Sequence, residues 1–166
     1  MEASLDISSA TESEPDYAFG AIAEWHCPVG KDGRIVLSDG SAWHAVSNRK
    51  SYEAICETVE LLFKRGKPIF ISGDRKTGIV GFVSIPRALA VEGISDLMAD
   101  RQIKVSFYGP PSVYHLRQDR SWFRAAEDLL RRSAQSGGSM SKPDLMISVD
   151  TLTNEILDVR RLRTSN

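Results

Sequence analysis

Short apolar runs separated by turn residues open the chain and predict β-strands. Residues 17–25 are small and mostly apolar, and two β-rich runs, 34–37 and 42–46, flank Asp39-Gly40. Asp-Gly between such runs is typical of a tight hairpin, because both residues tolerate a positive φ. We therefore expect three strands before residue 47.

The apolar spacing then changes to that of a helix. From Tyr52 to Phe63 apolar residues recur three and four positions apart, which places them on one helical face. Ser51 can cap the start of this helix, and Gly66 with Pro68 ends it. Two more strands, 69–72 and 79–83, follow. The expected order is three strands, a helix and two strands.

The same pattern returns in the second half of the chain, which predicts a duplicated unit. At an offset of 76, residues 69–83 share five identities with residues 145–159. Asp74 and Asp150 are then expected to accept backbone N–H bonds in matching turns. At an offset of 70 the alignment pairs Arg34 with Lys104, Ile35 with Val105, Leu37 with Phe107, Val46 with Leu116, Ser51 with Ser121, Tyr52 with Trp122 and Val59 with Leu129.

The repeat is imperfect at two places. Gly109-Pro110-Pro111 replaces Asp39-Gly40, so the second copy needs a different loop there. Residues 86–100 fit either a strand, with Ala88–Val91 as a poor candidate, or a short helix. The alternative to a duplication is a single α+β domain in which a helix-then-hairpin element recurs.

This order of elements resembles the OB-fold, a five-stranded barrel with its helix between the third and fourth strands. The resemblance covers residues 17–86 and, less completely, 87–162, and no signature motif supports it. It implies two OB-like units. The composition of residues 1–16 predicts an acidic disordered tail before them, and residues 163–166 are expected to be a short tail. OB-folds bind single-stranded nucleic acid, oligosaccharides or proteins across the second and third strands, so the ligand class stays open.

A ligand surface on those strands would use aromatic and basic side chains, because bases stack on rings while cations follow the phosphates. Strands alternate their faces, so half of such residues belong to the core instead. The candidate ligand-binding residues are Arg34, Trp43, His44, Lys104, Tyr108, Tyr114 and Arg117.

Charge favours a protein partner over nucleic acid. The formal net charge is −1 at pH 7, without the basic excess of a protein that neutralises phosphates. Recognition at an exposed strand edge or in a groove suits this composition, and self-association through such an edge is included in the prediction. Single-stranded nucleic-acid binding by the second unit is the alternative.

No motif points to catalysis, a cofactor or a metal. His26, His44 and His115 lie in no catalytic signature, and no nucleophile elbow, phosphate loop or dinucleotide fingerprint occurs. Cys27 follows His26 directly, without the spacing of metal ligands, and Cys56 is expected to be a small apolar filler. The sequence therefore predicts a non-catalytic binding or scaffolding protein. An enzyme with a site assembled from distant residues is a further alternative.

The cellular compartment is predicted from the absence of a membrane span, a secretion signal and a disulfide framework in the sequence. Apolar runs are too short to span a bilayer, and the N-terminus lacks the order of a secretion signal. Two cysteines are too few for a disulfide scaffold. We therefore expect a cytoplasmic protein without a membrane partner.

Overall fold

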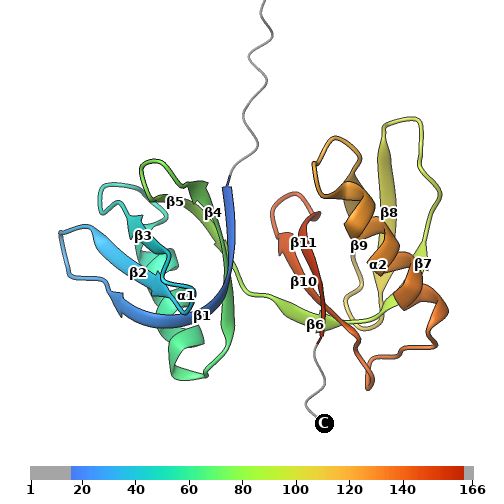
Figure 1. Cartoon of the computed structure of the whole chain (residues 1–166), viewed down its shortest axis with the longest axis horizontal. Coiled ribbons are helices and arrows are strands. Elements are labelled where there is room, and N and C mark those ends of the chain that lie inside the picture. The colour runs from blue at the N-terminus through green and yellow to red at the C-terminus, as the bar shows by residue number, and fades with distance from the viewer. Residues whose placement is uncertain (1–15, 163–166) are drawn as a thin grey trace, which may run out of the picture.

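The computed structural model describes residues 16–162 as two β-rich halves joined by a short linker (Figure 1). The fold is mixed α+β and mainly β, with two helices and two sheets, which confirms this level of the sequence prediction. Residues 1–15 of the predicted N-terminal tail, and the predicted tail at 163–166, lie outside the described residues.

The first half is a closed sheet of five strands in the order β1-β2-β3-β5-β4. A long first strand closes it, because residues 16–21 pair with β4 while residues 22–26 pair with β2. A helix, α1, buries Ile55, Val59 and Leu62 against this sheet. The bounds are β1 (Asp16–His26), β2 (Gly33–Leu37), β3 (Ala42–Ala45), α1 (Tyr52–Lys64), β4 (Pro68–Asp74) and β5 (Ile79–Ser84).

The second half is a sheet of six strands in the order β6-β10-β11-β9-β8-β7. The edge strands β6 and β7 are separated only by Ala90, and together they take the place that β1 has in the first half. Residues 87–94 are thus strand rather than helix. The bounds are β6 (Arg87–Leu89), β7 (Val91–Ile94), β8 (Gln102–Phe107), β9 (Val113–Arg117), α2 (Phe123–Gln135), β10 (Leu145–Asp150) and β11 (Glu155–Arg161).

Strand pairing in the two halves corresponds residue by residue. Ile71 pairs with Val83 and Ile147 pairs with Val159, at the predicted offset of 76. A bulge interrupts each of these ladders at the same place, after Ser72 and after Ser148. The first strands also correspond, since β1 and β7 each carry a bulge in their pairing with the next strand.

The predicted offset of 70 is wrong by one residue after the second strand. The structure matches the pair Arg34–His44 with Lys104–His115, an offset of 70 on one strand and 71 on the next. The loop between β8 and β9 is one residue longer than that between β2 and β3, because Gly109-Pro110-Pro111 cannot form the tight turn. The predicted pairs Val46–Leu116, Tyr52–Trp122 and Val59–Leu129 are therefore each shifted by one position.

The helix starts differ from the sequence expectation in two ways. Ser51 occupies the N-cap position of α1, but its side chain makes no capping hydrogen bond. Its predicted counterpart Ser121 lies one residue before Trp122, which is the N-cap residue of α2. Both helices are held by the burial of their apolar faces rather than by side-chain capping.

The closing hairpins confirm the predicted turn chemistry. Asp74 Oδ1 accepts a hydrogen bond from the Lys76 amide at 2.8 Å, and Asp150 Oδ1 accepts one from Leu152 at 2.9 Å. Gly78 and Asn154 follow at corresponding positions, with φ of 72° and 59°. Both lie in the left-handed region that these two residue types tolerate best.

The two halves meet through the outer faces of β1, β4 and β5 on one side and β10 and β11 on the other (Figure 1). Phe70 is fully buried, yet it belongs to neither hydrophobic core. Its neighbours across the sheet both contact the second half: Ser84 Oγ donates to the Val149 carbonyl at 3.0 Å, and the Arg160 guanidinium lies 4.4 Å from the Phe19 ring centre. The Phe70 ring is therefore buried between the halves, in a contact that we call the junction.

Candidate binding groove at the junction

A groove with a cavity volume of about 600 Å³ opens beside the junction. Thr58 on α1 and the end of β5 form its side in the first half. Tyr114 on β9 and Asn154 in the β10–β11 turn form its side in the second half. Concave surfaces between two structural units are frequent sites of ligand binding.

Apolar side chains reach solvent inside this groove. Ile85, in the linker between β5 and β6, is 45% exposed, and Phe82 and Val83 are half-buried. Val83 also packs against the core of the first half, and this packing fixes the position of the segment. Exposed apolar side chains on a concave surface with a fixed backbone are typical of a binding site for another molecule.

The groove also contains an open strand edge. Along its length β5 pairs with β4, but it pairs with β3 only where Ile79 meets His44. From Gly81 onwards no described strand pairs with the other side of β5. Among the described residues, β6 and β7 are further edges of three and four residues, and β11 has a corresponding open stretch because it pairs with β9 only where Glu155 meets His115. The last part of β5 is the open stretch that lines the groove.

Among residues 16–162, Arg87 is the only charged one that lines the groove. Its side chain is exposed and, among the described residues, forms no hydrogen bond or ion pair. An uncompensated guanidinium beside apolar surface favours a partner that carries a carboxylate.

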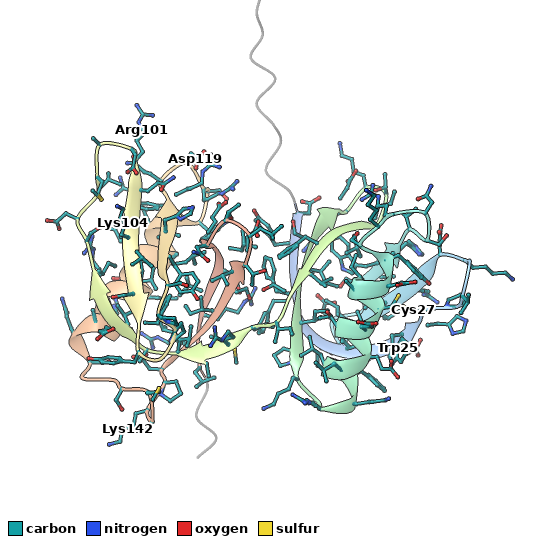
Figure 2. The ribbon with its side chains drawn as sticks, turned by 180° about the vertical axis from the view of Figure 1, so that it is seen from behind. Trp25, Cys27, Arg101, Lys104, Asp119 and Lys142 are labelled. Atoms are coloured by element: carbon teal, nitrogen blue, oxygen red, sulfur yellow. The ribbon has the colours of Figure 1, made fainter. Side chains whose placement is uncertain are left out.

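The basic residues predicted for ligand binding lie outside this groove. Arg34 faces His44 across β2 and β3, and Lys104 faces His115 across β8 and β9. Figure 2 places Lys104 on the side of the second half away from the first. Arg117 forms an ion pair with Asp119, with Nε–Oδ1 at 3.0 Å. The strand order therefore brings together one basic residue and one histidine on the outer face of each half.

The aromatic residues predicted for the same surface are mainly core residues. Trp43 is 1% exposed and Tyr114 is 7% exposed, and each packs in the core of its own half. Tyr108 is half-buried. Alternation of faces explains this, because His44 and His115 take the outward positions next to these two rings. Of the seven predicted residues, Tyr114 is the one that lines the groove.

Sequence reasoning missed the main groove residues, which are Phe82, Val83, Ile85 and Arg87. They lie on the segment that leaves one half and enters the other. The sequence contains one signal for this segment. The apolar run that forms β5 continues past the strand to Ile85-Pro86, where a loop is expected to be polar.

A second cavity, of about 460 Å³, lies between the β1–β2 turn and α1. Cys27 and Cys56 both line it and lie near each other. Cys27 lies at this turn next to Trp25 (Figure 2). Cys56 is half-buried and lines the cavity, so it is more than the apolar filler expected from the sequence. The Tyr52 hydroxyl lies 2.8 and 2.9 Å from the Pro28 and Lys31 carbonyl oxygens, so it shares one proton between them.

The Cys27 thiol and the Tyr52 hydroxyl stay protonated at neutral pH. Burial raises the pKa of the Cys27 thiol to about 12, and the neighbouring Cys56 raises it further in the same direction. Burial and the contact with Cys56 also raise the pKa of Tyr52 to about 12. A protonated thiol is a poor nucleophile.

The raised pKa of Cys27 predicts a loss of stability in alkali. A group that holds its proton more tightly when folded contributes full stability below its unfolded pKa, near 9, and loses it as the pH rises towards 12. We expect Cys27→Ala to lower the urea midpoint less at pH 11 than at pH 8, relative to the native chain. Tyr52→Phe is the matched test for the neighbouring hydroxyl. Equal effects at the two pH values would contradict the account.

No known protein family, curated protein or solved structure matches this chain. Within residues 16–162, no three His, Cys, Asp or Glu side chains gather closely enough to hold a metal ion. Neither described helix combines the length and apolar character needed to cross a membrane. The groove's own geometry and chemistry therefore carry the functional inference.

Proposed function

We propose that this chain is a non-catalytic binding protein that holds a segment of a protein partner in the junction groove. One observation carries the proposal: exposed apolar side chains and an open strand edge occur together in one concave surface. Protein segments are recognised by these two means, since backbone groups pair along an edge while pockets select side chains.

We further infer that residues 17–86 and 87–162 are two OB-like units derived by duplication. The corresponding strand pairs, with bulges at the same places, support this inference. So does the position of each helix between the third and fourth strands of its half, when β6 and β7 are taken together. The units differ at Ala90, which divides the strand that is continuous in β1.

Nucleic-acid binding is the rival that one observation favours. The pairs Arg34–His44 and Lys104–His115 place basic side chains on the second and third strands of each half, where OB-folds bind their ligands. Stacking, however, needs exposed rings, and the rings of Trp43 and Tyr114 are buried. Protein binding therefore accounts for more of the surface.

The enzyme alternative receives less support from the geometry. His44 and His115 lie in different halves, on outer sheet faces, and neither lines the groove. Nucleophilic catalysis requires a base beside the nucleophile, oriented by a third group. The groove residues instead provide apolar surface that can contact a partner.

A selection with displayed peptides tests the proposed function. Short random peptides are selected on the immobilised protein, and the enriched ones are measured by fluorescence anisotropy. We expect Ile85→Asp to weaken binding at least about tenfold, because it places a charge on the central apolar surface. Val29→Asp, at a fully exposed site outside the groove, is the control and should leave binding unchanged.

An oligonucleotide titrated at two salt concentrations completes the test. Peptides that bind native protein and Ile85→Asp equally well would contradict the proposed site. Failure to enrich peptides, together with tight and strongly salt-dependent oligonucleotide binding, would replace the proposal with its rival.

A further inference from the structure

Resting on the proposed function, we propose how the partner binds: an extended segment adds as a strand to the open edge of β5, with an Asp or Glu placed to pair with Arg87. The partner is a different protein whose segment has apolar residues at alternate positions. Backbone pairing, side-chain spacing and charge each contribute a separate observation.

Unpaired backbone groups on β5 are the first observation. Pairing with β3 is confined to the bridge at Ile79, so one edge of the strand from Gly81 to Ser84 has no strand partner among the described residues. The Arg49 guanidinium lies 3.4 Å from the Val80 carbonyl oxygen, at the long end of hydrogen-bond distances. Among the described residues, no backbone hydrogen bond from a turn or loop involves residues 81–84. Exposed N–H and C=O groups in a row are a template for another strand.

Side-chain spacing supplies the second observation. A strand lying along β5 would direct alternate side chains towards the groove and the others towards solvent. The groove side presents Val83, Ile85 and the edge of the Tyr114 ring, which are apolar, with Thr58 and Asn154 at its margins. Apolar residues at every second position of the partner would therefore be buried.

Charge supplies the third. Arg87 follows the end of β5 by three residues and is the one charged side chain that the described part of the chain places in the groove. A carboxylate on the incoming segment can accept two parallel hydrogen bonds from the guanidinium, which fixes the position of the segment along the strand. A basic segment would be repelled at the same place.

A second copy of the chain fits this site less well. The edge strands that a copy offers, β6 and β7, are only three and four residues long. A copy's β11 also has an open stretch, because it pairs with β9 only at Glu155, but this strand ends in Arg160 and Arg161, which the Arg87 guanidinium would repel. A separate protein with a free extended segment meets the requirement.

Backbone methylation of a selected peptide tests the binding mode. Two versions carry N-methyl groups at alternate backbone nitrogens, so that each removes the donors of one strand edge. We expect one version to bind at least about tenfold more weakly and the other to bind like the parent peptide. Arg87→Glu should weaken an acidic peptide to a similar extent, and a Lys in place of the peptide's carboxylate should restore binding. Arg34→Glu, outside the groove, is the control.

The outcomes separate the two proposals. If both methylated versions bind as well as the parent while Ile85→Asp still weakens it, strand addition is overturned and the proposed function stands. If no peptide is enriched, the proposed function itself fails. If the protein instead forms concentration-dependent dimers that Ile85→Asp abolishes, the occupant is a second copy and the separate partner is overturned.

Discussion

Phe70→Ala is expected to lower the free energy of unfolding by about 3–5 kcal/mol, the usual cost of emptying a buried phenylalanine site. Phe70 is fully buried, and its ring lies 5.3 Å from that of Tyr17. Because it belongs to neither core, its removal leaves the cavity in the junction. Urea unfolding followed by circular dichroism and tryptophan fluorescence measures the change.

Phe63→Ala is the matched control, since the same substitution is made at a residue that is 43% exposed on α1. We expect it to cost clearly less than Phe70→Ala, since much of the Phe63 ring faces solvent and its ring contact is an edge-on one with Trp25 at 6.5 Å. If Phe70→Ala were as mild as Phe63→Ala, the outer face of β4 would not be covered by the second half, and the groove would lose its structural basis.

Gly73→Ala is expected to destabilise the protein by roughly 3 kcal/mol or more, at the upper end for overpacking. A Cβ at this position would lie 2.3 Å from the Ile79 carbonyl oxygen and 3.0 Å from the Trp43 ring. The first atom is backbone, so it cannot rotate away. Gly73 lies at the bulge between β4 and β5, and the whole ladder would have to shift. The urea midpoint again provides the measurement.

Gly81→Ala provides the comparison on the paired strand. A Cβ there would meet its nearest atom, the Ser72 carbonyl oxygen, at an ordinary 3.5 Å. We expect a change below about 1 kcal/mol, since the added methyl group lies at an exposed position. Comparable losses for the two variants would contradict close approach as the reason for a glycine at position 73.

The second half has different residues at the positions that correspond to Gly73 and Trp43. Val149 occupies the position that corresponds to Gly73, and Tyr114 occupies that of Trp43. The larger ring in the first half therefore faces the residue without a side chain. Such exchanges between neighbouring positions keep the core volume filled while the strand pairing is retained.

The elements of each half could be predicted from the sequence because their signals are local. Apolar spacing located both helices, and Asp74 and Asp150 marked the matching turns that the structure confirms. The one-residue shift after β8 could not be predicted from spacing, because a loop with Pro110 and Pro111 has no fixed length relative to Asp39-Gly40.

The groove could not be predicted because it depends on how the halves pack. A partial signal exists in Ile69-Phe70-Ile71, three consecutive apolar residues that are all fully buried. Such a run is typical of a strand covered on both faces, whereas the alternation of the other strands indicates one covered face. The run indicates that β4 is covered, but it does not identify the surface that covers it.

The most direct test of the central claim is an NMR titration of the labelled protein with an enriched peptide. We expect chemical-shift changes to be concentrated on Thr58, Val83, Ile85 and Asn154, which surround the groove. Changes concentrated instead on Lys104 and His115, on the outer face of β8 and β9, would contradict the account.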